Sequence, residues 1–300
     1  MNRGRLAGLL AISATSLLWG TTGTAATFAP GVGPVAIGAA ALGIGGLLQA
    51  AIAVPALRVA RSGLRQHVGC HHRGDCRGDL SAGFYSSMDA AGVAVGSVVS
   101  LASAPLASGV LERLVDRRAL SRWWVLAAGL GILGSALLCV SKLDGNAGSG
   151  VSIMVGIGLG LVAGSTYAIY SWASHRLMKS GISRAASMGA VFGGGGLLLM
   201  PVLVMTGAPL LATPQAFSVG AYMALVPMFL GYLLFGFGLT KVSASAATTA
   251  TLTEPAIATL LAVLIVGERL ETLGWTGLVV IATCSSSLPW RPQTPTRTNP

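Results

Sequence analysis

The stretch LTEPAIATLLAVLIVGERL at residues 252–270 decides the fold of this chain, because an earlier stretch repeats its pattern. The full repeat reads VSASAATTATLTEPAIATLLAVLIVGERLETLGW at 242–275 and GVAVGSVVSLASAPLASGVLERLVDRRALSRWW at 92–124. In each copy small residues lead to a proline, a Leu-rich end, a charged turn and a tryptophan. Pro105 aligns with Pro255 at an offset of 150 residues. The pattern therefore predicts two halves derived from one unit.

The composition indicates a membrane protein. Of the 300 residues 53% are hydrophobic and only 9% are charged, whereas a soluble domain has about 25% charged residues. The mean hydropathy is +0.74. The net charge of +10 would suggest a nucleic-acid partner in a soluble protein. Here the basic residues gather in short loops, a distribution typical of membrane topology, so we expect a bilayer and no nucleic acid.

Nine apolar runs are long enough to cross a bilayer, which takes about 20 helical residues. They lie at 6–28, 33–57, 91–112, 122–142, 152–174, 187–207, 217–239, 243–266 and 273–290. The Pro- and Thr-rich tail at 291–300 is predicted to be a disordered cytoplasmic segment.

Two equal halves require an even number of spans, and the missing third helix would lie between 57 and 91. Residues 68–80 in this interval are aberrant, because they carry Arg73, Asp75, Arg77 and Asp79. Each of these costs about 2.5–3.5 kcal/mol at the centre of a bilayer. The third helix is therefore degenerate in this sequence.

The distribution of basic residues distinguishes nine spans from ten. Ten spans place both termini in the cytoplasm, together with all of the 19 lysines and arginines except Lys142 and Arg269. Nine spans would divide the basic residues almost equally between the two sides. The positive-inside rule therefore favours ten spans, in a multi-pass protein of the plasma or inner membrane.

Two further interpretations concern residues 68–80. A compensated frameshift is one, since a shifted reading of 68–83 can encode an apolar run; the nucleotide sequence would test it. A zinc site is the other, with the ligand types Cys70, His71, His72 and Cys76. Their spacing matches no common zinc pattern, and adjacent histidines rarely bind one ion. We therefore expect neither a metal nor a cofactor.

Three segments resemble the drug/metabolite transporter superfamily, in particular its EamA-type members. They are LLWGTTGTAA from Leu17, LASAP from Leu101 and LTEPAIATLLAVLIVGERL from Leu252. The resemblance extends from about Leu6 to Pro289. It fails at 68–80, where the family has a hydrophobic third helix.

This resemblance implies an all-α integral membrane fold of ten transmembrane helices, arranged as two five-helix repeats at 1–145 and 150–290. It also implies a secondary carrier that moves small organic solutes, commonly outward. Amino acids, nucleosides, amines and drugs all stay open as substrates.

The residues support a compatible mechanism by themselves. An odd number of helices per half inserts the second half upside down, and inverted repeats place a central site near the midplane for alternating access. Helix interruptions at Pro105 and Pro255 would expose backbone groups only where these line a cavity. The alternative is a kink packed against a neighbouring helix.

Glu254 is the strongest candidate for a residue of the solute or ion pathway. Ionisable side chains within membranes are rare and often mark such pathways. A carboxyl group in an apolar environment could bind and release a proton near neutral pH, which suits proton-coupled export; it would also suit a cationic substrate. The alternative is a structural carboxyl group, hydrogen-bonded to Thr251, Thr253 or a neighbouring helix.

Aromatic side chains supply the remaining pathway candidates, which are Trp19, Tyr167, Tyr170 and Tyr232. Trp19, Tyr167 and Tyr170 belong to the first helix of each half, and Tyr232 to the eighth. Aromatic rings suit amphipathic metabolites and cations. Trp and Tyr are also common anchors at the membrane surface.

Two alternative classes of function are a membrane enzyme and an inactive relic of a carrier. The apolar runs hold essentially one carboxylate and no histidine, so they lack the polar constellation that an enzyme requires; we expect no enzyme. A relic would result if the third helix had been damaged.

Overall fold

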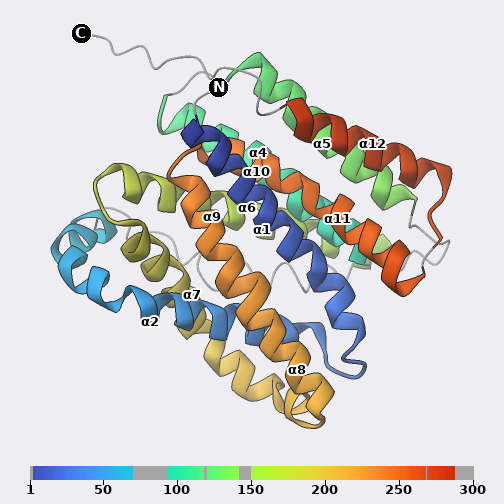
Figure 1. Ribbon diagram of the computed structural model, residues 1–300, viewed down its shortest axis with the longest axis horizontal. Coiled ribbons are helices and arrows are strands. Elements are labelled where there is room, and N and C mark those ends of the chain that lie inside the picture. Colours follow the sequence, from blue (N-terminus) through green and yellow to red (C-terminus); the bar gives the residue numbers. More distant parts are fainter. Residues whose placement is uncertain (1–2, 70–92, 118–119, 142–149, 268, 288–300) are drawn as a thin grey trace.

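The computed structural model describes residues 3–69, 93–117, 120–141, 150–267 and 269–287, and every regular element within them is helical (Figure 1). The α-helices are α1 (Arg3–Thr27), α2 (Pro34–Gly69), α4 (Val93–Leu114), α5 (Arg122–Val140), α6 (Gly150–Lys179), α7 (Arg184–Thr206), α8 (Pro214–Met223), α9 (Gly231–Leu239), α10 (Ala244–Ala250), α11 (Glu254–Leu261) and α12 (Thr272–Ser287). Short 3₁₀ turns occur at η1 (Ala208–Leu211) and η3 (Thr251–Thr253), and π turns at η2 (Ala224–Leu230) and η4 (Ala262–Val266).

Within the described residues, each of the nine predicted apolar runs corresponds to a helix or a continuous series of helical segments. The prediction that the second run ends at 57 is wrong, because α2 continues through Pro55 to Gly69. Leu, Arg, Gln and Ala are good helix formers whether or not they lie in lipid, so the apolar boundary does not end the helix. The predicted third helix, the ligand types at 70–76 and the tail at 291–300 lie outside the described residues.

Five of the described helices are long and apolar enough to cross a bilayer. They are Arg3–Thr27, Pro34–Ala60, Arg184–Thr206, Pro214–Leu239 and Ala244–Val266. Large aliphatic side chains point outward from them, and Val204 is 78% and Leu264 77% exposed. Such an apolar surface is suited to lipid. The described residues therefore have the architecture of a helical integral membrane protein.

Helices from distant parts of the chain pack closely in pairs. α2 packs along α7, α4 along α6 and α5 along α12, while α1 contacts both α9 and α11. Glycines bring these backbones together: a Cβ atom at Gly46 would meet the carbonyl oxygen of Phe192, and one at Gly164 would meet Ser100 and Ser103. Small residues have this role in membrane helices, because contact between apolar surfaces gains little in lipid.

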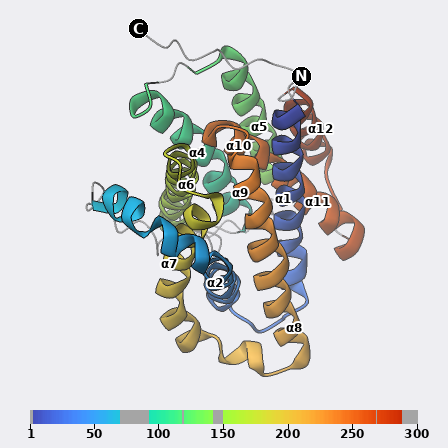
Figure 2. The ribbon, with the colours of Figure 1, turned by 60° about the vertical axis from the view of Figure 1, so that its left-hand side comes forward.

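One end of the molecule collects the start of α1, the end of α4, the start of α10 and the end of α12, whereas α8 lies at the opposite end (Figures 1 and 2). We call the first the α4–α10 end. His175 of α6 reaches it as well, with its Nδ1 atom 2.7 Å from the carbonyl oxygen of Leu239. Several helix ends from both halves of the sequence therefore meet in one region.

Candidate functional site

The helix that contains Pro255 is interrupted at its centre. Proline has no N–H group, so the carbonyl oxygen of Thr251 loses the α-helical donor four residues later. It accepts instead from the N–H of Glu254, three residues later, and Thr251–Thr253 form a 3₁₀ turn. Glu254 is therefore the first residue of a new helix, at the position of the interruption.

Threonine side chains favour this interruption. The hydroxyl of Thr251 donates to the carbonyl oxygen of Thr248 at 2.9 Å, and that of Thr253 donates to Ala250 at 2.9 Å. Hydroxyl groups that bond to the preceding turn commonly bend helices. The sequence around Pro255 thus combines a missing N–H donor with threonine hydroxyls that donate to the backbone carbonyls of the preceding turn.

The Glu254 side chain is half-buried and follows the 3₁₀ turn whose Thr251 hydroxyl lies 2.9 Å from the hydroxyl of Tyr167. Among the described residues it forms no hydrogen bond or ion pair. The hydroxyls of Thr251 and Thr253 are directed to backbone carbonyls instead. The structural alternative required one of these hydroxyls, or a neighbouring helix, as a partner.

The four predicted aromatic candidates lie together in the core. The Trp19 ring is 5.0 Å from that of Tyr232, and the Tyr167 and Tyr170 rings stack at 5.2 Å. The hydroxyl of Tyr170 donates to that of Tyr232 at 3.3 Å. The helices α1, α6 and α9 therefore bring these four rings into one cluster.

Tyr167 links this cluster to the helix interruption. Its hydroxyl is 2.9 Å from the hydroxyl of Thr251, the first residue of the 3₁₀ turn. The ring is 7% exposed, so the bond is protected from bulk solvent. The aromatic cluster and the Glu254 region are thus in direct contact.

The indole nitrogen of Trp19 forms a hydrogen bond to the backbone. Its indole Nε1 donates to the carbonyl oxygen of Pro227 at 3.0 Å, inside the π turn η2. Gln49 of α2 donates to Phe229 in the same turn at 2.8 Å, and the hydroxyl of Thr15 donates to Gly231 at 3.1 Å. Buried carbonyl groups need such partners, so these three side chains support the irregular backbone.

Pro105 differs from its counterpart. The prediction of an interruption at Pro105 is wrong, since α4 is α-helical from Val93 to Leu114. Ala104 is fully buried, and Pro105 is among the most buried residues of the chain. Dense packing maintains the helix geometry around the missing donor. Pro105 therefore does not share the irregular backbone found at Pro255.

Two phenylalanines of the aromatic cluster were not predicted from the sequence. Phe192 packs on Tyr232 with ring centroids 4.0 Å apart, and Phe235 is fully buried between the other rings. Phenylalanine in an apolar run gives no signal of its own, which explains the omission.

The expectation that the apolar runs hold essentially one carboxylate needs correction. Glu112, in the last turn of α4, is 5% exposed and hydrogen-bonded to Ser245. Glu112 lies at the end of a predicted apolar run, directly before the charged residues of 113–118, so the sequence gave no indication that its side chain is buried.

Within the described ranges no three His, Cys, Asp or Glu side chains gather in a way that could hold a metal ion. The candidate site therefore consists of aromatic rings, threonine and tyrosine hydroxyls, one carboxyl group and an irregular backbone. Polar and ionisable side chains inside membrane helices often mark substrate or ion pathways.

The comparisons with known proteins identify the family. The model of the EamA-like transporter family matches residues 154–285. The uncharacterized transporter YwfM of Bacillus subtilis strain 168 is 33% identical over 275 residues, covering 89% of this chain and 88% of its own length. An uncharacterized transporter of Clostridium kluyveri is 29% identical over 140 residues, 43% of this chain and 42% of its own.

This chain belongs to the EamA-like transporter family. A solved crystal structure at 18% sequence identity has the same fold, with a TM-score of 0.75 over 94% of this chain and 96% of the other. The resemblance to EamA-type drug/metabolite transporters is confirmed. Family membership points to a transporter of small molecules in a membrane and away from an enzyme.

Proposed function

We propose that this protein is a secondary-active carrier that exports small metabolites, such as amino acids, amines or drugs, by alternating access, with Glu254 as the proton-binding group. The observation that carries this proposal is the Glu254 side chain: a half-buried carboxyl at a helix interruption, next to a tyrosine cluster and without a partner among the described residues. Intramembrane carboxyl groups in such surroundings are typical of ion and solute pathways.

The packing of the helices supports two inverted five-helix repeats at 1–145 and 150–290, and thus ten spans. If the halves correspond, α2 and α7 are counterparts, and so are α5 and α12; both pairs pack together. The contact of α4 with α6 has a counterpart in the contact of α11 with α1. A two-fold relation between the halves would produce these pairings.

The charges support an orientation with the α4–α10 end in the cytoplasm. The basic residues at the helix ends that meet there are Arg3, Arg5, Arg113, Arg122, Arg176, Lys179, Arg184 and Lys241. Arg184 and Lys241 both lie over the Phe237 ring, at 5.7 and 5.9 Å from its centre. By the positive-inside rule this end faces the cytoplasm, and both termini with it.

The solute pathway that we propose runs past Glu254 and Pro255 on one side and Trp19, Tyr167, Tyr170 and Tyr232 on the other. Pro105 enters the proposal as the counterpart of Pro255 on the facing helix. The rings offer π surfaces to amines and apolar surfaces to metabolites. The irregular backbone before Pro255 supplies the flexibility that opening of the pathway requires.

The experiment uses purified protein in proteoliposomes with a pH gradient and a pH-sensitive dye. Tryptophan, phenylalanine and benzylamine serve as probe solutes, and uptake of each is measured at several pH values. We expect solute-dependent proton movement in the wild type, and flattening of its pH dependence in E254Q. The exposed Glu271 provides the matched control, since E271Q removes a carboxylate outside the pathway.

Two results contradict the proposal. If E254Q transports with the same pH dependence as the wild type, Glu254 does not bind the coupled proton. If a wider solute panel gives no transport at all, the inactive relic is the better interpretation. The nucleotide sequence across codons 66–84 then tests whether the third helix has been lost.

A further inference from the structure

A second buried carboxyl group lies away from the proposed pathway. Glu112 is 5% exposed, and both of its carboxylate oxygens are occupied. The backbone N–H of Ser245 donates to Oε1 at 2.9 Å, and the Ser245 hydroxyl donates to Oε2 at 2.8 Å. One carboxyl group of the first half thus binds one residue of the second half twice, at the start of α10.

Neighbouring contacts extend this connection along both helices. One turn before Glu112, the hydroxyl of Ser108 lies 2.7 Å from that of Thr248. The indole Nε1 of Trp124 donates to the carbonyl oxygen of Ser245 at 3.1 Å, and its ring covers Gly109. Donors and acceptors on Ser245 are therefore bound from α4 and α5 together.

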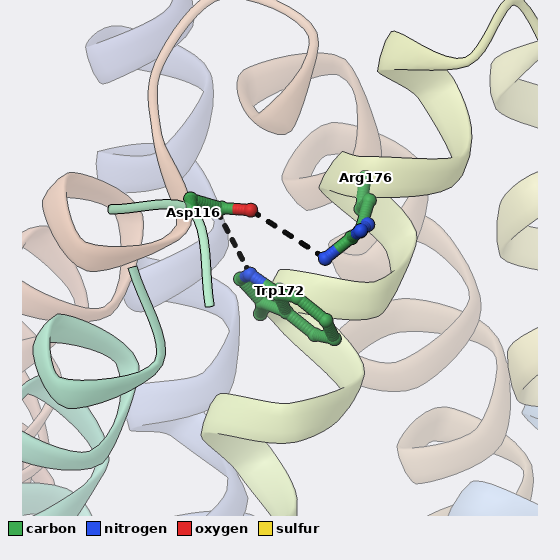
Figure 3. A network of polar contacts seen from close by, with 3 residues as sticks. All are labelled: Asp116, Trp172 and Arg176. Atoms are coloured by element: carbon green, nitrogen blue, oxygen red, sulfur yellow. Dashed lines mark hydrogen bonds and ion pairs between the residues drawn. The ribbon is translucent and has the colours of Figure 1, made fainter. Parts of the chain in front are cut away.

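The end of α4 is tied to α6 as well (Figure 3). Asp116 accepts from the indole Nε1 of Trp172 at 2.9 Å and pairs with Arg176 at 3.6 Å. The Arg176 guanidinium also lies over the Trp172 ring, 5.0 Å from its centre. Because Arg176 is half exposed to solvent, this pair is the weaker of the two connections.

These contacts hold α4 and α10 together at one end only. α10 packs on α4, while α11, beyond the interruption, packs mainly on α1 and contacts α5. α4 and the α10–α11 run therefore lie together at the α4–α10 end and diverge after the interruption at Pro255. The buried residues at the start of α10 include Ala244, Ala246 and Ala247, which leave little side-chain bulk to interlock.

We infer that Glu112 and Ser245 form a latch that keeps the cytoplasmic end of the carrier closed in this conformation and must open once in each transport cycle. The inference rests on the proposed alternating access. A carboxylate suits this role because hydrogen bonds to a charged group are strong and directional, yet break completely after a small displacement. An apolar contact of the same area would lose its stabilisation gradually with separation.

The test measures access to a residue behind the latch. S108C is nearly isosteric and replaces a fully buried side chain one turn deeper than Glu112. It is made in the full chain with the four native cysteines replaced by alanine. The reaction of the introduced thiol with a membrane-impermeant maleimide is followed in inside-out and right-side-out vesicles, for S108C alone and combined with E112Q, S245A or E271Q.

We expect E112Q to raise the labelling rate from the cytoplasmic face about tenfold, because it replaces a charged acceptor by a neutral one. S245A should raise the rate by a smaller factor, since the bond from its backbone N–H stays. E271Q, which alters the exposed carboxylate directly before α12, should leave the rate unchanged. The gel-filtration profile of each variant reports folding independently of labelling.

Four outcomes would overturn the latch. They are an unchanged rate in folded E112Q, a rate raised equally in E271Q, labelling only from the outside, and a failure of both E112Q and S245A to fold. The last would make the pair purely structural. The assay needs no transported solute, so a failure here leaves the proposed transport intact, and raised labelling without transport would contradict only the proposed function.

Discussion

α4 and the α10–α11 run share one sequence pattern, yet only one of them keeps a regular helix. In α4, Pro105 is tightly packed, and the α-helical hydrogen bonds continue on both sides of it. At Pro255 the chain forms a 3₁₀ turn and begins again as α11. The difference teaches that a proline alone does not interrupt a membrane helix, and neither does a hydroxyl bonded to the preceding turn, since Ser103 of α4 donates to the carbonyl oxygen of Ser100; the packing around the proline matters as well.

The side chain before each proline extends the comparison. Ala104 is fully buried, while Glu254 is half-buried at the interruption. The regular copy thus has a small apolar residue where the irregular copy has a carboxyl group. A pathway that runs between two related helices would have its ionisable chemistry on one side only.

The largest expected effect comes from moving the carboxyl group to the other copy. A104E would bury an unpaired carboxyl at a fully packed position, which costs about 3 kcal/mol or more. We expect A104E to aggregate in detergent, measured by gel filtration, whereas E254A stays monodisperse. If A104E folds with unchanged thermal stability, the two copies are less different than their packing indicates.

Replacing each proline in turn gives an intermediate effect. P255A restores an N–H group that can bond to Thr251, worth about 1 kcal/mol. Thermal unfolding should therefore shift upward, while solute uptake falls, because the interruption becomes a stiffer helix. P105A gains a similar bond and loses buried ring contacts, about 0.8 kcal/mol per methylene, so its stability should change little. Equal uptake by P255A and wild type would show that transport does not require the helix interruption at Pro255.

A further expected effect, on stability alone, concerns the hydrogen bond between Tyr167 and Thr251. T251V leaves a buried phenol without its partner and should cost about 1–2 kcal/mol, more than Y167F. The double variant measures the coupling between the two side chains, which we expect to be about 1 kcal/mol. Thermal unfolding of all four proteins provides the values. Strict additivity would mean that the tyrosine cluster does not support the 3₁₀ turn.

Much of the fold was predictable because long apolar runs have few alternatives in a bilayer. In the part of the chain that the structure describes, the predicted runs are helical, and the interruption near Pro255 follows from a missing N–H group. The end of α2 was not predictable from hydropathy, since good helix formers continue it to Gly69. At Pro105 the same covalent chemistry has another outcome, because tertiary packing is invisible in a single sequence.

The residues of the candidate site were predictable from the sequence, but their hydrogen-bond partners were not. Glu254 and the four aromatic residues stand out as rare residue types in apolar runs. Their partners do not: nothing in the sequence pairs Trp19 with Pro227 or Tyr167 with Thr251. Glu112 was missed because a carboxylate at a helix end usually faces water. Only the approach of α10 makes it a buried acceptor.

The bond from Trp19 to Pro227 has a chemical consequence for recognition. With its one N–H group already donated to the backbone, the indole offers neighbouring molecules a flat, electron-rich face and no proton. Any selectivity it confers would depend on shape and polarisability. A solute that demands a hydrogen-bond donor would have to find it on the tyrosine hydroxyls instead.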